Sequence, residues 1–187
     1  GVILGEDGRK MSKRLRNYPD PSVLVDQHGS DALRAALLMS GAVSGSDIRF
    51  SGASVHDSVR RLHLPLLNAL HLHTAYAAID GFAPAGQNAV PGAMPAPAPG
   101  PAPSRLDRAL LGEAERMRGD VEAAMDRYDF AAAYRAIEEF IGFLSTWYLR
   151  LVKPRLWRHG LDDAKRAAYQ ALHAALAQVA VVSATFL

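Results

Sequence analysis

A basic segment near the start of the sequence carries the residue types best suited to phosphate chemistry. Residues 7–21 read DGRKMSKRLRNYPDP and place Lys10 and Lys13 three positions apart, with the hydroxyl of Ser12 between them. Flexible ammonium side chains are mobile point charges that suit a polyphosphate. A preorganised donor that stabilises charge on a leaving pyrophosphate contributes roughly 2.7–4 kcal/mol in a water-poor site. These residues therefore indicate phosphate binding, and a solvated basic turn is the alternative.

A second candidate group interleaves aromatic and cationic residues in STWYLRLVKPRLW, residues 145–157. Single-stranded RNA favours this combination, because bases stack on aromatic faces while cations meet phosphates. Trp147 lies four residues before Leu151, and this spacing is also typical of side chains packed in a helix core. Trp157 follows Pro154, which makes a core position less favoured for it. The candidate RNA contacts are Trp147, Arg150, Lys153, Arg155, Trp157 and Arg158.

The histidines show no pattern of a metal site, and no metal is predicted. His71 and His73 are two residues apart on an expected helix, so they point to different faces and cannot form the i, i+4 pair of a helical zinc site. We expect both to be surface or half-buried residues. The sequence has no Cys, which excludes a disulfide framework and a thiolate metal site.

Composition indicates one sizeable folded core, with or without an appendage. The chain has 187 residues, 49% of them hydrophobic, and a net charge of +2 from 21 basic and 19 acidic residues. Only local clusters of cations can therefore attract anions strongly. The apolar run at residues 174–187 contains Gln178 and is shorter than the roughly 20 residues that a membrane span needs. These features indicate a soluble, cytoplasmic protein.

Helical patterns cover every long segment, which predicts an all-α antiparallel bundle. Asp20, Ser30 and Ser104 are N-cap candidates, and Pro21 suits the first position of a helix. The segment GVIL at the start is the only candidate strand, and residues 41–52 are too rich in Gly and Ser to be helical. Expected helices cover residues 21–28, a segment from Ser30, and residues 53–79, 104–127, 129–152 and 162–187.

Prolines are expected to interrupt the predicted helices. Pro65 and Pro154 are expected to kink or end their helices. Seven of the eleven prolines fall in residues 82–104, which predicts a semi-extended linker. The predicted domains are residues 1–52 and a helical bundle at residues 53–187. The helix of residues 53–79 is expected to bury one stripe, made of Val55, Val59, Leu62, Leu66, Leu70 and Leu72.

Three ordered segments resemble class I aminoacyl-tRNA synthetases of the isoleucyl type. GRKMSKRLRNYPDP resembles the Lys-Met-Ser-Lys-Ser loop, with Arg14 in the fifth place. GSDALRAALLMSGAVSGSDIRFS, residues 29–51, resembles the stem-contact segment. FLSTWYLRLVKPRLW, residues 143–157, resembles the Asn-Trp-Tyr-Ile-Arg helix of the anticodon-binding domain, although Leu151, Val152 and Pro154 stand where Arg or other polar residues are common in the family.

The resemblance implies roles for individual residues. Lys10 and Lys13 would stabilise the phosphates of ATP during adenylate formation, and Met11 and Ser12 would shape the loop around ATP. The helices after residue 52 would receive the anticodon stem of tRNA. The family's second signature, His-Ile-Gly-His on a Rossmann-type sheet, is not found in these residues, so we expect this chain alone to be catalytically inactive.

Two interpretations follow from the resemblance. In the first, the chain is a tRNA-binding C-terminal portion of an isoleucyl-tRNA synthetase. In the second, it is a free-standing degenerate module that binds RNA or another protein. The intact Lys10–Lys13 motif favours the first. Either way, the apolar surface of residues 174–187 is expected to need a cover, from the rest of the bundle, a catalytic domain or another subunit.

Overall fold

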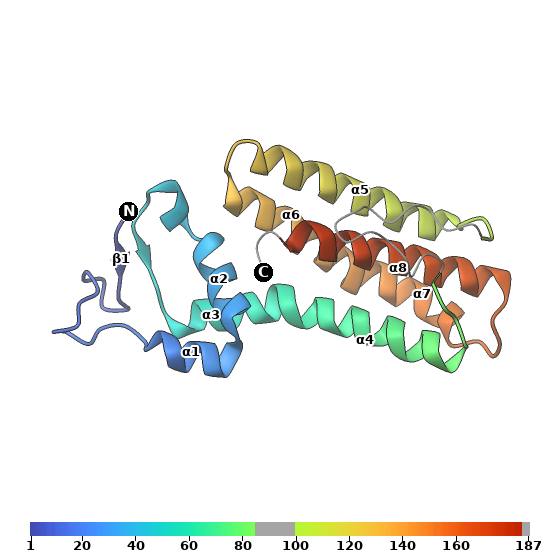
Figure 1. Cartoon of the computed structure of the whole chain (residues 1–187), viewed down its shortest axis with the longest axis horizontal. Helices are drawn as coiled ribbons and strands as arrows, with labels where there is room; N and C mark the ends of the chain where they lie inside the picture. Colours follow the sequence, from blue (N-terminus) through green and yellow to red (C-terminus); the bar gives the residue numbers. More distant parts are fainter. Residues whose placement is uncertain (85–99, 185–187) are drawn as a thin grey trace. The chain divides into compact units, whose positions relative to one another are not determined.

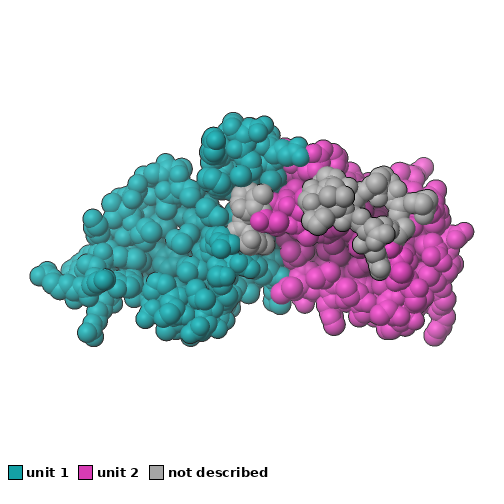
Figure 2. All heavy atoms as spheres, in the orientation of Figure 1, with its two compact units in different colours: residues 1–64, 120–138, 186–187 teal, residues 65–119, 139–185 magenta. Residues whose placement is uncertain are grey.

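A computed structural model describes residues 1–84 and 100–184 of the chain (Figure 1). Most of this part is helical, which confirms the all-α prediction. Two compact units are present, residues 1–64 with 120–138 and residues 65–119 with 139–185 (Figure 2). Their boundaries lie within helices. Within the described residues, no helix is long and apolar enough to cross a membrane.

The first unit begins with two very short strands. The predicted strand is present as β1 (Ile3–Leu4), which pairs in parallel with β2 (Ile48–Arg49). Strand β2 and the 3-10 turn η1 (Gly41–Ser44) lie in residues 41–52, which were expected not to be helical. Two residues are too few to give an alternating sequence pattern, so only the pairing with β1 defines β2.

Capping residues set the limits of the next two helices. Helix α1 (Pro21–His28) starts as predicted, because the side chain of Asp20 accepts a hydrogen bond from the Ser22 amide. Helix α2 (Ser30–Leu38) differs, since Gly29 is its N-cap and no side chain caps it. The prediction that Ser30 is the cap is therefore wrong, and its hydroxyl donates to Asp31 instead. Gly29 has φ 85°, which lets it end α1 and open α2.

A small core joins the N-terminal helices of this unit. Helix α3 (Gly52–Ser58) contributes Val55, which is buried with Leu24, Ala32 and Phe50. The Ser58 hydroxyl donates to the carbonyl of Ala32. Met11 of the basic segment packs partly buried against this core.

The predicted helix of residues 53–79 contains a π-helical turn. Helix α3 leads into η2 (Val59–His63) and then α4 (Leu64–Ile79), with Pro65 at the second position of α4. Leu70 is 44% exposed, in contrast to the predicted stripe. The buried residues of α4 are Ala69, His73 and Ala77.

The remaining helices form the part of the chain from residue 104 onwards. Helix α5 (Arg105–Met125) is followed by α6 (Phe130–Phe143), the π-helical turn η3 (Leu144–Tyr148), α7 (Leu149–Leu156) and α8 (Asp163–Ser183). Pro154 lies inside α7 without ending it, in contrast to the prediction that the helix ends at residue 152. Pro154 is exposed, so solvent can reach the carbonyl that its missing N–H leaves unpaired.

The apolar C-terminal helix is covered by the bundle itself. Leu172, Ala175 and Val179 of α8 are fully buried. Gln178 is buried too, and its amide donates to Glu115 of α5. No separate partner is therefore needed to cover the described part of the run, which ends at residue 184. The prediction for residues 185–187 lies outside the described residues.

Both ends of the predicted linker segment belong to the folded part of the chain. Phe82 is buried and its ring stacks on the Tyr169 ring with centroids 5.1 Å apart. At the other end, the Ser104 hydroxyl accepts a hydrogen bond from the Asp107 amide and so caps α5 as predicted. Residues 85–99, which carry most of the predicted linker, lie outside the described residues.

His73 is buried, contrary to the prediction for it, whereas His71 is exposed as predicted. The centroid of the His73 ring lies 6.0 Å from that of the Tyr169 ring and 5.6 Å from that of the His173 ring. Its Nδ1 has no hydrogen-bond partner among the described residues. Burial, and secondarily the neighbouring His173, lower the pKa of His73 to about 4.

Acidification is therefore expected to destabilise the fold through His73. The pKa of this imidazole is 6.5 when unperturbed and about 4 in the fold, so between these values the unfolded state binds more protons. The free energy of unfolding therefore does not depend on His73 protonation above pH 6.5. It falls as the pH is lowered towards 4, by about 3 kcal/mol in total. Urea unfolding at several pH values measures this loss. His73→Phe should flatten the pH dependence and His71→Gln should not; equal slopes in all three proteins would contradict the assignment.

Candidate functional site

Hydrogen bonds hold the basic segment in a defined conformation. The Asp7 carboxylate accepts from the Arg9 amide at 3.0 Å and from the Asn17 side chain at 3.1 Å. These two bonds, the first above all, place the pKa of Asp7 below its ordinary value. The Asn17 carbonyl oxygen in turn accepts from the Ser12 amide at 3.0 Å. Residues 7–17 therefore form a closed loop, which is called the basic loop below.

The basic loop is anchored to strand β1 and presents its cations to solvent. The Met11 amide donates to the Ile3 carbonyl at 3.3 Å, and the Met11 side chain packs on the core of the first unit. Lys10 and Lys13 are exposed, and neither ammonium group has a partner among the described residues. The Ser12 hydroxyl accepts from the Leu15 amide. The loop thus presents the ammonium groups of both lysines from a backbone held by Met11 and Ser12.

Gly8 allows an arginine from strand β2 to lie against this loop. Its φ of 73° is in the left-handed region, and a Cβ at this position would lie 3.2 Å from a guanidinium nitrogen of Arg49. Any larger residue would be strained and would displace that guanidinium. Arg49 therefore adds a further cation beside the loop, from a strand that the sequence did not predict.

The second candidate group lies along η3 and α7 and presents a mixed aromatic and cationic face. Trp147 is 41% exposed, Leu151 50% and Trp157 58%. Trp147 stacks on Phe143 with ring centroids 4.8 Å apart but is not a core residue. The core positions are instead Leu144 and Tyr148, both fully buried. This surface, called the α7 face below, consists of Trp147, Arg150, Leu151, Lys153, Pro154, Trp157 and Arg158.

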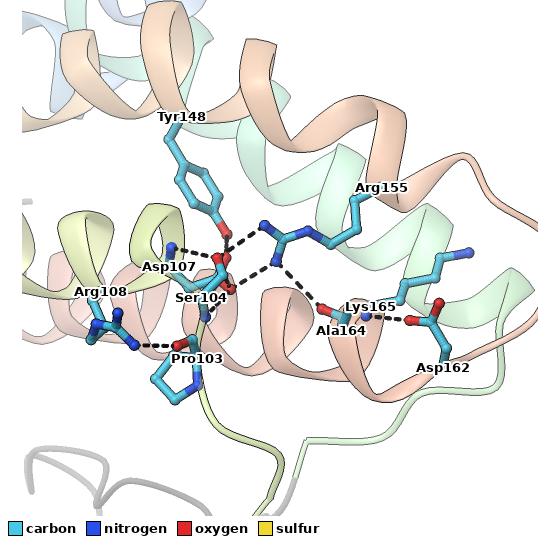
Figure 3. A network of polar contacts seen from close by, with 9 residues as sticks. All are labelled: Pro103, Ser104, Asp107, Arg108, Tyr148, Arg155, Asp162, Ala164 and Lys165. Atoms are coloured by element: carbon cyan, nitrogen blue, oxygen red, sulfur yellow. Dashed lines mark hydrogen bonds and ion pairs between the residues drawn. The ribbon is translucent and has the colours of Figure 1, made fainter.

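Arg155 belongs to a different environment, which Figure 3 shows. Its guanidinium forms an ion pair with the fully buried Asp107 at 2.7 Å and donates to the Ser104 hydroxyl at 3.0 Å. The Tyr148 hydroxyl donates to the other Asp107 oxygen at 3.0 Å. The Ser104 hydroxyl also donates to Asp107, at 2.7 Å. Asp107 therefore accepts bonds from α7, from η3 and from its own helix cap.

This network changes the role assigned to Arg155. Burial opposes ionisation of Asp107, but the bonds from Ser104 and Arg155 outweigh it and keep the carboxyl pKa below its ordinary value. Burial and the same carboxylate raise the pKa of the Tyr148 phenol, which stays protonated as a donor. The guanidinium is engaged with Asp107 and Ser104. We therefore do not expect Arg155 to contact an RNA phosphate, in contrast to the prediction from the sequence. A cap signal at Ser104 was readable in the sequence, but no local pattern joins residues 48 positions apart.

Comparison with known proteins shows the family to which this chain belongs. Residues 107–187 match the family described as the anticodon-binding domain of tRNA ligase. Residues 1–51 match the family described as tRNA synthetases class I (I, L, M and V). Over 187 residues the chain is 48% identical to isoleucine–tRNA ligase 2 of Pseudomonas fluorescens. The chain belongs to the class I aminoacyl-tRNA synthetases, isoleucine type.

A further relative of this synthetase chain is also an isoleucine–tRNA ligase. It is 36% identical over 186 residues to the isoleucine–tRNA ligase of Treponema denticola, and it covers 98% of its own length in that match. It spans only 17% of the length of each of these two ligases. The fold is similar to a crystal structure of a ternary complex of Agrobacterium radiobacter K84 LeuRS, tRNA and LeuAMS. That match has a TM-score of 0.64 and 19% identity, and it covers all of this chain and 21% of the other.

These matches distinguish the two interpretations of the sequence. The synthetase chain aligns along its whole length with a C-terminal part of intact isoleucine–tRNA ligases. The basic loop lies in the class I match, and the α7 face lies in the anticodon-binding match. The interpretation as a portion of a ligase is therefore favoured over a free-standing module.

Proposed function

We propose that this chain is the tRNA-positioning portion of an isoleucine–tRNA ligase. The observation that carries the proposal is the α7 face, which exposes two tryptophans among cations within the segment that matches an anticodon-binding domain. Large apolar side chains gathered on one exposed face are typical of interaction surfaces. Aromatic rings interleaved with cations suit the unpaired bases and phosphates of an RNA loop.

The basic loop has a separate role in this proposal. Lys10 and Lys13 would meet the phosphates of the ligase's ATP, while Met11 and Ser12 hold the loop that presents them. The support for this role is physical, since two exposed ammonium groups extend from a backbone that is closed by hydrogen bonds and anchored on a core. Such preorganised cations stabilise charge that develops on the leaving pyrophosphate. The residues for adenylation would then come from the ligase's other domains together with this loop.

Salt dependence of tRNA binding tests the role of the α7 face. Replacing Lys153 and Arg158 by Ala should flatten the slope of log affinity against log salt by roughly 1.4, because each contact to a single-stranded phosphate contributes about 0.7. Fluorescence anisotropy of labelled isoleucine tRNA between about 50 and 200 mM salt measures the slope. Circular dichroism should show unchanged helix content.

A charge-matched control separates contact from net charge. Arg105 and Arg127 are exposed cations at other places in the chain. Replacing both by Ala removes the same charge and should leave the slope nearly unchanged. Equal flattening in the two double variants would contradict a contact at α7. No tRNA binding by the folded chain at about 50 mM salt would overturn the proposed function.

A further inference from the structure

One side chain, that of Asn17, contacts both halves of the basic loop. Its carbonyl oxygen accepts from the Ser12 amide at 3.0 Å, and its amide nitrogen donates to Asp7 Oδ1 at 3.1 Å. The same nitrogen donates to the backbone carbonyl oxygens of Arg9 and Lys10, each at 3.4 Å. Asn17 therefore holds the backbone both before and after the centre of the loop.

Both the acceptor and the donors of this amide are used. An Asn side chain has one carbonyl acceptor and two N–H donors. The acceptor meets a backbone N–H, and the donors meet the Asp7 carboxylate and two backbone carbonyls. A carboxylate of the same shape at position 17 would keep the acceptor, but it would lose the donors and place a like charge beside Asp7.

Asp7 completes this contact from the other end of the loop. Its Oδ1 also accepts from the Arg9 amide at 3.0 Å. The bonds from the Arg9 amide and from Asn17 favour the ionised carboxylate and hold the pKa of Asp7 below its ordinary value. The contact between Asp7 and Asn17 thus joins an ionised acceptor to an amide donor, and it closes the segment that contains both lysines.

The turn that precedes Asn17 depends on such a closure. Arg16 has a φ of 48°, in the left-handed region, and its amide donates to the Ser12 carbonyl at 3.0 Å. This φ is uncommon for a residue other than Gly and persists only where the surrounding contacts fix it. The bond from the Ser12 amide to Asn17 is one of these contacts.

We propose that Asn17, held by Asp7, is a positioning residue for adenylate formation, because it fixes the backbone from which Lys10 and Lys13 extend. The inference rests on the proposed role of the basic loop and adds a residue that acts through the two lysines. In this step a carboxylate oxygen of isoleucine bonds to the α-phosphorus of ATP, and the bond from that phosphorus to the bridging oxygen breaks. Pyrophosphate leaves with the electron pair, and the ammonium groups stabilise its charge. A loop that no longer holds them in place lowers the rate.

Substitutions in a complete ligase test this role. The ligase is a chimera in which this chain replaces the matching segment of Pseudomonas fluorescens isoleucine–tRNA ligase 2, to which it is 48% identical. Asn17→Asp should lower kcat for isoleucine-dependent exchange of pyrophosphate into ATP by roughly 100-fold, the loss that a misplacement of about 1 Å can cause. KM for ATP should change little, because the interaction acts in the transition state.

Exchanging the two side chains should restore most of the rate. In the exchanged pair, Asp7→Asn combined with Asn17→Asp, an amide again faces a carboxylate, and both positions still accept from their backbone amides. Asp7→Ala combined with Asn17→Asp is the matched control. It has the same net charge as the exchanged pair but cannot form the bond, so its rate should stay low.

The order of the loop is measured in this chain alone by ¹⁵N relaxation of the Lys10 and Lys13 amides. Their order parameters should fall from about 0.85 to below about 0.6 in Asn17→Asp and rise again in the exchanged pair. Circular dichroism should show the same helix content in all variants. Order parameters that Asn17→Asp leaves unchanged would contradict the positioning role.

The remaining outcomes separate this inference from the function on which it rests, with Lys13→Ala measured in the same chimera. If Lys13→Ala slows exchange and Asn17→Asp does not, Asn17 is not a positioning residue and the proposed role of the loop stands. The same conclusion follows if the exchanged pair and its charge-matched control recover equally. If neither Lys13→Ala nor Asn17→Asp slows exchange, both the inference and the proposed role are overturned.

Discussion

Replacing Arg155 by Ala is expected to lower the free energy of unfolding by about 3–5 kcal/mol, because it leaves the fully buried Asp107 carboxylate without its cation. The bonds from Tyr148 and Ser104 remain, but neutral donors do not compensate a buried charge fully. Urea unfolding followed by circular dichroism measures the change. Lys153→Ala, two positions earlier and not part of the network, should stay within about 0.5 kcal/mol of the unmodified chain.

A double substitution tests whether the unpaired charge causes the loss. Asp107→Leu combined with Arg155→Met removes both charges and should recover a large part of the stability, since apolar residues of similar volume often replace a buried pair without cost. If Arg155→Ala left the stability unchanged and instead flattened the salt dependence of tRNA binding, Arg155 would be a phosphate contact as the sequence suggested.

Replacing Lys10 or Lys13 by Ala is expected to slow adenylate formation by roughly 100- to 1,000-fold, if the proposed role of the basic loop is correct. Each ammonium would stabilise charge on the departing pyrophosphate, so its loss should lower kcat more than it raises KM for ATP. The test needs a complete ligase. A chimera in which this chain replaces the matching segment of Pseudomonas fluorescens isoleucine–tRNA ligase 2 provides one, because the two are 48% identical over that segment.

Isoleucine-dependent exchange of pyrophosphate into ATP measures the effect in this chimera. Arg16→Ala removes an exposed cation from the same loop and is the matched control; little change is expected. Lys13→Arg should restore part of the rate, since the charge is kept but its geometry differs. A rate that falls equally in the Arg16 and Lys10 variants would indicate a general effect of loop charge and not a defined phosphate contact.

Local signals allowed much of the helical architecture to be predicted. Of the predicted caps, Asp20 and Ser104 begin α1 and α5 through hydrogen bonds to amides two or three residues away. Such contacts depend only on adjacent residues, so they can be read from the sequence. The motif of the basic loop and the two later segments likewise predicted the synthetase family, which the comparisons confirm.

Register and burial could not be read in the same way. Leu70 was predicted to be buried, but the buried residues of α4 are Ala69, His73 and Ala77. Neighbouring apolar residues fit almost the same helical stripe, so which of them is buried depends on the segments that pack against the helix. Strand β2 was missed because its two residues form a strand only through pairing with β1.

The sequence by itself determined the helix starts, the basic loop and the presence of aromatic and cationic residues in one helix. Tertiary structure decided which of those cations are available to a ligand. Lys153, Arg155 and Arg158 look alike in sequence, yet only the second meets a buried carboxylate, which a helix starting 50 residues earlier provides. Capping and helix formation depend on adjacent residues, whereas the cost of burying a charge, and the pairing that offsets it, depend on which distant segment packs against it.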